Sequence, residues 1–348
     1  MPGLDRFDAI PKVELHCHVE GTVRPLTVVE LARKHGGSLP TEDPTELYRF
    51  DSLNSFLAVF WLVQELIGDR DDWARVAHES IVDAAPHGLR YREMFFTPAR
   101  HLAAGQALGD IVAGLTEGVE AAERETGVRC ALICDIDRSF GGDAATELAE
   151  ELASLRRAGR ADRVIGLGMD STERGVDPRD FARAYDVARA AGLRATGHAG
   201  EDSGPENIAA ALEALDLERI DHGVAIVDDP ELMARVAGAR IPLDVCPTSN
   251  IVIANRFPTL ADHPFRRMRE AGLLVTINTD DPAMTDLDLG SEYRAVAEAL
   301  GYTFDEMCEI AVDGIEATWL DPGEHASLRA AFRREIDAVE LHSWAPPA

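Results

Sequence analysis

The amino-acid sequence predicts a (β/α)8 barrel, an α/β fold of the TIM type, with a helical insertion after the first strand. Short runs rich in β-branched residues alternate with stretches rich in Ala, Leu, Glu and Arg along the 348 residues. Such alternation is typical of a parallel sheet with helical crossovers, and eight units fit a single barrel domain spanning 1–348. A doubly wound open sheet is the competing fold. No Gly-x-Gly-x-x-Gly follows the first predicted strand, which weakens the dinucleotide-binding form of that alternative.

Eight segments have the length and composition of buried strands. They are Lys12–His18, Leu89–Phe96, Val128–Ile136, Val164–Met169, Leu193–His198, Arg219–His222, Ile241–Cys246 and Leu273–Asn278. The helical segments between them include Asp110–Glu125, Ala144–Arg157, Pro178–Ala191, Pro205–Leu215 and Pro230–Ala237.

The insertion is predicted at about 26–87, between the first two strands. Within it, Ser52–Ile67 and Asp71–Ala85 have the composition of helices. The insertion carries the aromatic residues Phe50, Phe56, Phe60 and Trp61. These side chains either cover a pocket at the mouth of the barrel or simply pack in the core.

Composition and charge exclude several classes of partner. Apolar residues make up 46% of the chain, and the formal charge is 34 − 62 = −28. So negative a surface repels phosphate backbones and anionic membranes, so we expect no nucleic-acid or membrane partner. The five cysteines are scattered and odd in number, which favours thiols. We see no signal-peptide pattern and no apolar run of about 18 residues, so a cytoplasmic protein is expected.

Polar residues collect at the ends of four predicted strands, where a barrel builds its active site. His16 and His18 are two apart on one strand and therefore face the same way. The other strand ends carry His198, Glu201, His222, Asp280 and Asp281. Taken singly, each is compatible with a turn or a solvated strand end. Together, three imidazoles and a carboxylate suit zinc, with coordination left for water.

Five segments carry a resemblance to one known family. They are Pro11–Thr22, Gly197–Glu201, Arg219–Gly223, Cys246–Asn250 and Asn278–Pro282. In this order and at this approximate spacing they resemble the motifs of the adenosine deaminase family, whose members include adenosine and adenine deaminases. The resemblance covers about Pro11 to Ile336. It implies a (β/α)8 barrel with one zinc ion per chain, and hydrolytic removal of the 6-amino group of a small purine.

The resemblance also implies a role for each site residue. The implied metal ligands are His16, His18, His198 and Asp280. The implied catalytic residues are Glu201, which protonates the purine ring, His222, which lies beside the attacking water, and Asp281, which hydrogen-bonds purine N7. The implied substrate-binding residues are His18, Glu20, Ser171, Glu173 and Asp281. Glu201 must be protonated to act at N1, and a partly dry pocket rich in carboxylates favours that form.

The motifs do not all predict the same substrate. Glu20 and the segment Asp170–Glu173 resemble the adenine deaminases. The segments Gly204–Ile208, Cys246–Asn250 and 278–286 lack the adenine-type pattern or resemble the adenosine enzymes. We therefore expect a 6-aminopurine nucleoside, adenosine or a modified adenosine, with free adenine as the alternative.

Two other classes compete. A different barrel hydrolase with a carboxylated lysine is disfavoured, because the chain has only Lys12 and Lys34 and neither ends a middle strand. A non-catalytic binding homologue is disfavoured because every implied ligand and the proton donor are present. The small cytidine-type deaminases are excluded, since their His-x-Glu and Pro-Cys-x-x-Cys motif is absent. Nothing in the sequence indicates the oligomeric state.

Overall fold

Each of the eight segments predicted to be strands contains β-structure in the computed structural model, which describes residues 6–41 and 43–343. The strands are β1 (Lys12–Glu14), β2 (Leu89–Phe96), β3 (Arg129–Asp137), β4 (Val164–Asp170), β5 (Arg194–Ala195), β6 (His198–Ala199), β7 (Ile220–His222), β8 (Leu243–Val245) and β9 (Val275–Ile277). All pairs are parallel, in the orders β1-β2-β3-β4-β5 and β6-β7-β8-β9.

Hydrogen bonds join the two runs of strands into a ring. β5 and β6 are two pieces of the single strand predicted at Leu193–His198. Between them, Thr196 N donates to Leu167 O (3.0 Å), and Gly197 O accepts from Asp221 N (3.0 Å). At the other seam, His18 N donates to Asp280 O (2.9 Å). The predicted (β/α)8 barrel is therefore confirmed.

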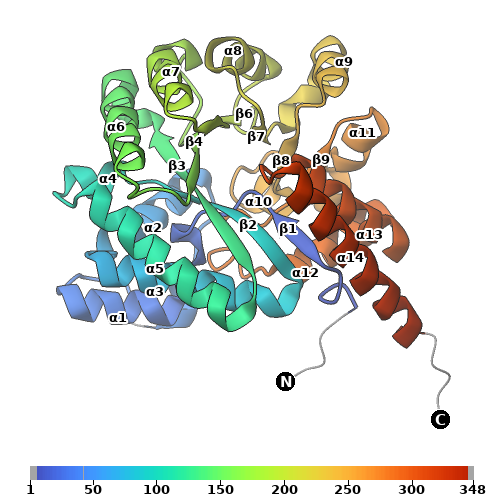
Figure 1. Ribbon diagram of the computed structural model, residues 1–348, viewed down its shortest axis with the longest axis horizontal. Coiled ribbons are helices and arrows are strands. Elements are labelled where there is room, and N and C mark those ends of the chain that lie inside the picture. The colour runs from blue at the N-terminus through green and yellow to red at the C-terminus, as the bar shows by residue number, and fades with distance from the viewer. Residues whose placement is uncertain (1–5, 42, 344–348) are drawn as a thin grey trace.

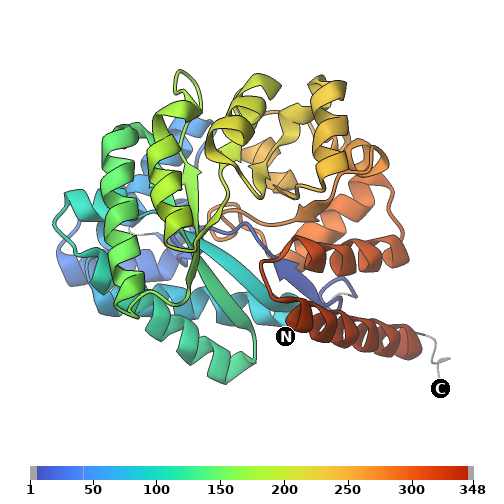
Figure 2. The same cartoon turned by 45° about the horizontal axis from the view of Figure 1, so that its top comes forward.

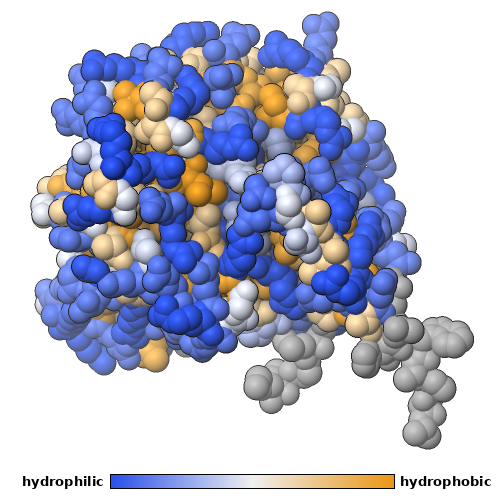
Figure 3. Space-filling view, in the orientation of Figure 1, coloured by the Kyte–Doolittle hydropathy of each residue, from blue (hydrophilic) through white to orange (hydrophobic). Residues whose placement is uncertain are grey.

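Helices surround the strands on the outside of the ring (Figures 1 and 2). The α-helices of the described residues are α1 (Pro25–His35), α2 (Leu53–Leu66), α3 (Arg70–Ala84), α4 (Ala99–Ala103), α5 (Leu108–Thr126), α6 (Gly141–Arg157), α7 (Ala182–Ala190), α8 (Pro205–Leu215), α9 (Pro230–Ala239), α10 (Pro247–Val252), α11 (Phe265–Glu270), α12 (Leu289–Leu300), α13 (Phe304–Asp313) and α14 (Pro322–Ser343). Hydrophilic residues cover most of the face seen in Figure 3. Within the described ranges, no helix has the length and hydropathy needed to cross a membrane.

Three α-helices occupy the stretch between β1 and β2, and α2 and α3 match the two helices predicted there. Ser52 begins α2 with a capping box that Ser55 completes. The backbone N–H groups of Ser52 and Ser55 therefore both find side-chain acceptors. α3 lies close along α5, where a Cβ at Gly118 would come within 2.1 Å of Ala74 O. Glycine is therefore required for this close approach of the two helix backbones.

Buried ion pairs fill part of the barrel between the strands. Arg219 pairs through Nη1 with Glu93 and through Nε with Asp244, each at 2.6 Å, and its guanidinium lies 4.1 Å from the ring centre of Trp319. All three charged side chains are fully buried. The sequence did not reveal this network, because ion partners far apart in the chain leave no local pattern.

Candidate active site

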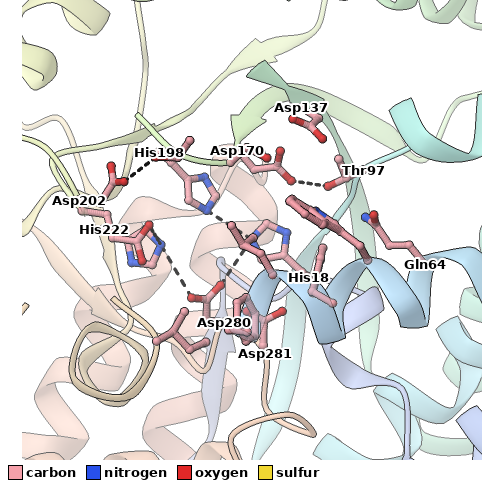
Figure 4. Close-up of a pocket in the computed structure, with 18 residues that line it drawn as sticks. His18, Gln64, Thr97, Asp137, Asp170, His198, Asp202, His222, Asp280 and Asp281 are labelled. Carbon is pink, nitrogen blue, oxygen red and sulfur yellow. Dashed lines mark hydrogen bonds and ion pairs between the residues drawn. The ribbon is translucent and has the colours of Figure 1, made fainter. Parts of the chain in front are cut away.

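The four predicted metal ligands meet at the carboxyl ends of three strands. His16 Nε2 lies 3.2 Å from Asp280 Oδ1, His18 Nε2 lies 3.4 Å from the same oxygen, and the Nε2 atoms of His18 and His198 are 3.3 Å apart. Ligand atoms about 2.1 Å from a tetrahedral zinc ion are about 3.4 Å from one another. These three distances are close to that value. Figure 4 shows His18, His198, His222 and Asp280 pointing toward one another.

Buried ring nitrogens without partners support the same conclusion. Both nitrogens of His16 are buried and make no hydrogen bond among the described residues. On the far sides of the other two rings, Asp135 Oδ2 lies 3.7 Å from His18 Nδ1, and Asp221 Oδ2 lies 3.5 Å from His198 Nδ1. Carboxylates in this position orient metal-binding histidines. The donor set and its surroundings fit a zinc ion.

His222 lies beside this cluster rather than within its tightest part. Its Nε2 is 3.8 Å from Asp280 Oδ2 and 3.7 Å from Glu201 Oε2. One atom from each of His16, His198, His222 and Asp280 lies within 4.8 Å of the others, so this set could also hold an ion. The shorter distance from His18 to Asp280 favours His18 as the ligand.

The charges of the cluster shift the pKa values of its carboxyl groups. Burial alone would raise the pKa of Asp280, but His16, His222 and His18 hold it well below its usual range. Burial raises the pKa of Glu201 to about 7, with Asp280, Glu173 and Asp202 contributing and His222 opposing. Burial, followed by Asp280, Glu20 and Glu201, raises the pKa of Asp281 well above its usual range. Glu201 is therefore available as an acid near neutral pH, and protonated Asp281 as a hydrogen-bond donor.

Several site residues hold unusual backbone conformations. His222, Asp280 and Ser171 have φ values of 58°, 65° and 71°, in the left-handed region that disfavours residues with a Cβ. Strain of this kind clusters at functional sites, where the surrounding structure holds it in place. Position 21 requires glycine for a steric reason, because a Cβ at Gly21 would come within 1.9 Å of Asp281 Oδ1.

Glu173 was expected to bind substrate, but it is not among the residues that line the pocket. Its carboxylate accepts hydrogen bonds from the backbone N–H groups of Gly200 (2.7 Å), Glu201 (2.8 Å) and Asp202 (3.2 Å). Glu173 thus holds the loop that carries Glu201. Ser171, which was expected to bind substrate as well, does line the pocket.

Glu20 also lies outside the pocket lining. The strand β1 ends at Glu14, and Glu20 begins a short 3₁₀ helix, Glu20–Thr22. Glu20 Oε1 accepts a hydrogen bond from Thr97 N (2.9 Å), and its side chain is fully buried. Burial raises the pKa of Glu20 to about 7.

Two further walls of the pocket come from residues outside the predicted metal, catalytic and substrate-binding sets. One wall comes from α2, where the aromatic residues noted in the sequence do contact the pocket, and another from the ends of β2, β3 and β4. These lining residues are Phe56, Leu57, Phe60, Trp61, Gln64, Thr97, Asp137, Asp170, Thr172, Asp202 and Ile253. No Lys or Arg is among the described residues that line it.

Comparisons with known proteins agree with this geometry. The family model described as adenosine deaminase matches residues 11–335. An adenine deaminase from Streptomyces coelicolor is 38% identical over 341 residues, covering 97% of this chain and 98% of the relative. The crystal structure of an adenine deaminase from Arthrobacter aurescens is 32% identical with a TM-score of 0.88, covering 94% of this chain and 99% of that chain.

A zinc-containing structure is similar as well. It is an amidohydrolase from Burkholderia ambifaria with bound zinc, 34% identical with a TM-score of 0.89, covering 98% of this chain and 96% of that chain. The family resemblance predicted from the motifs is thus confirmed. The nucleoside substrate expected from the sequence is not, because the relatives named here fit the alternative, free adenine, better. This chain belongs to the adenosine deaminase family of metal-dependent hydrolases that act on purine C–N bonds.

Proposed function

We propose that this protein deaminates free adenine, with one zinc ion per chain held by His16, His18, His198 and Asp280. The observation that carries the proposal is the position of Glu201. Its carboxyl group has a pKa of about 7 and lies within 3.7 Å of His222 beside the predicted zinc ligands. An acid and a metal cluster in one pocket are the parts that hydrolysis of an aromatic amine requires.

The reaction adds water to adenine and yields hypoxanthine and ammonia. Zinc bound at this cluster supplies a nucleophile near neutral pH by lowering the pKa of water. Glu201 donates its proton to N1 of the ring, which makes the ring carbon at position 6 more electrophilic. Protonated Asp281 donates a hydrogen bond to N7, and Nε2 of His222 points to the side from which water attacks. The aromatic residues of α2 exclude bulk water from the pocket.

Two features of the pocket support a free base over a nucleoside or nucleotide. Glu20, a predicted substrate-binding residue whose carboxylate could have accepted hydrogen bonds from a sugar, accepts one from Thr97 N instead and does not line the pocket. The described lining also lacks Lys and Arg, so a phosphate group would meet carboxylates without a compensating cation.

A substrate panel tests the proposal. The zinc-loaded protein is assayed by ultraviolet absorbance and ammonia release with adenine, adenosine, 2′-deoxyadenosine, methylthioadenosine and AMP. We expect kcat/KM for adenine to exceed that for each nucleoside by roughly a hundredfold or more. A kcat/KM for any nucleoside equal to or above that for adenine would overturn the proposed substrate while leaving the deaminase chemistry intact.

A further inference from the structure

We propose that Asn250 and His263 are positioning residues that fix the tautomer of His222, so that a proton on its Nε2 faces the active site. Asn250 ends the motif Cys246–Asn250, to which the proposed reaction gives no part. For the catalytic use of His222 the inference rests on the proposed function. The hydrogen bonds themselves do not depend on it.

The chain of hydrogen bonds begins at a backbone N–H group, which fixes the donor of the first bond. Phe265 N, in the first turn of α11, donates to Nδ1 of His263 (3.2 Å). A backbone N–H can only donate, so this ring nitrogen is unprotonated. The ring is buried, and burial, with His222 contributing, lowers the pKa of His263 to about 3. The single proton of this neutral ring is therefore on Nε2.

The proton on His263 in turn sets the orientation of the Asn250 amide. Nε2 of His263 lies 3.1 Å from Oδ1 of Asn250, which must accept. The NH₂ group of Asn250 then faces His222, with Nδ2 3.1 Å from Nδ1 of that ring. An amide NH₂ only donates, so Nδ1 of His222 must accept. In its singly protonated form, the His222 ring consequently carries that proton on Nε2.

The surroundings keep this chain rigid and dry. His222, Asn250 and His263 are 1%, 0% and 3% exposed, so water has little access to the hydrogen bonds between them. The backbone of Asn250 is held at both ends, since its N–H donates to Cys246 O (2.9 Å) and its carbonyl accepts from Arg256 N (2.8 Å). A fixed backbone and a buried amide leave no alternative rotamer that keeps both partners satisfied.

The direction of the Nε2 proton decides what His222 does in the site. Nε2 faces the oxygens of Glu201 and Asp280 at 3.7 and 3.8 Å. An N–H in this place attracts an oxygen that lies between those groups, whether of water or of the developing hydroxyl on the substrate. A lone pair there could only accept a hydrogen bond from such an oxygen, and it would not stabilise negative charge that develops on it. The Asn250–His263 pair therefore makes His222 a donor toward the reacting oxygen.

The tautomer can be measured without any substrate. In zinc-loaded, ¹⁵N-labelled protein, long-range ¹H–¹⁵N correlation spectra distinguish a protonated from an unprotonated ring nitrogen. The signals of His222 are identified by their loss in His222→Gln. We expect an unprotonated Nδ1 and a protonated Nε2. A proton on Nδ1 of His222 in the unaltered protein would overturn the proposal.

A nearly isosteric variant of Asn250 reverses the donor and the acceptor in its hydrogen bond with His222. Asn250→Asp replaces the donating NH₂ with an oxygen that only accepts, so the proton of His222 should move to Nδ1. We expect kcat for the preferred purine to fall about 10- to 100-fold while KM and zinc content stay unchanged. His263→Gln, whose amide N–H can still donate to Asn250, should retain the tautomer and most of kcat. His263→Ala should lose both.

Gln106→Glu is the matched control. It makes the same amide-to-acid change beside another buried histidine, His101, outside the pocket lining. It should leave the signals of His222 and kcat unchanged. An Asn250→Asp protein with an unmoved proton and normal kcat would overturn the proposal. Should that variant fail to fold, the proposal is still tested by the spectrum of the unaltered protein and by the spectra and kcat values of the two His263 variants. Absence of adenine turnover with the expected tautomer would count against the substrate alone.

Discussion

Two carboxyl groups of this site have different roles. Burial raises the pKa of Glu201, so it can hold a proton, whereas Glu173 accepts hydrogen bonds from three backbone N–H groups. Both are needed for one task, because Glu173 fixes the backbone from which Glu201 reaches the substrate. Residue type alone did not distinguish Glu201, the acid, from Glu173, which holds the loop that carries it.

Glu173→Gln should weaken catalysis through the position of Glu201. The amide NH₂ group would face backbone donors, and the charge that strengthens these hydrogen bonds would be lost. We expect a fall in kcat of about 10- to 100-fold with zinc content retained, measured by steady-state kinetics and elemental analysis. The same change at exposed Glu206 is the control. Normal kcat in Glu173→Gln would show that the loop keeps its place without this carboxylate.

Glu201→Gln should lose turnover and gain stability. In the metal-free protein the pKa of Glu201 rises from 4.5 to about 7 on folding, so between these values the folded state binds more protons than the unfolded state. Its free energy of unfolding therefore decreases as pH rises from 4.5 to 7, and the full cost is present above 7. The Gln variant avoids that cost.

The measurement is the Tm of the metal-free proteins at pH 5.5 and pH 8. We expect Glu201→Gln to exceed the unaltered protein by a few degrees at pH 8, equivalent to about 1–3 kcal/mol, and by less at pH 5.5. Exposed Glu213→Gln, on α8, should show no such difference. With zinc restored, turnover of Glu201→Gln should be lower by several orders of magnitude. An equal Tm difference at both pH values would contradict the raised pKa.

At the scale of elements, α2 closes the pocket. Phe60 is buried, and its ring centre lies 6.3 Å from that of His18 in an edge-to-face arrangement. Phe56 packs on Phe60 with ring centres 5.7 Å apart. These side chains thus belong both to the core and to the pocket wall, which unites the two interpretations that the sequence left open.

Phe60→Leu should raise KM for adenine about tenfold with a smaller change in kcat. The shorter side chain leaves a gap over the ring of the substrate, while the metal ligands and Glu201 stay in place. Steady-state kinetics and zinc content distinguish this from a disrupted site. Phe140→Leu, at a partly exposed aromatic outside this pocket, is the control. An unchanged KM would show that α2 does not contact the bound base.

The order of the elements could be predicted from the sequence more fully than the contacts of the site. Buried parallel strands form continuous apolar runs, so β2 was predicted with its observed bounds and β3 and β4 nearly so. β1 was predicted too long, because His16 and His18 alternate as in a strand although its ladder ends at Glu14. The partners of Glu20 and Glu173 depend on loop paths, and a sequence pattern does not encode them.

At the scale of the whole molecule, the ion pairs of Arg219 support the barrel away from the zinc ligands. Arg219→Met should destabilise the protein by about 3–5 kcal/mol, because Glu93 and Asp244 would stay buried without their partner. Urea unfolding measures this loss. Arg183→Met, which removes an exposed ion pair with Glu150, should have no measurable effect. Equal midpoints for the two variants would mean that the buried network relaxes without cost.

Zinc should connect the barrel seam to overall stability. His16 and His18 follow β1, His198 begins β6, and Asp280 follows β9, so a single ion would link segments from both ends of the chain. A ligand that binds only the folded state raises stability with its concentration. We expect about one zinc ion per chain. Removal of the zinc by a chelator should lower the Tm and abolish deamination, and added zinc should restore both the Tm and the activity. His198→Ala should lack zinc and activity, and its Tm should no longer respond to the chelator. Metal-replete protein with no bound transition metal, or a Tm unaffected by chelation, would contradict this account of how the barrel is closed.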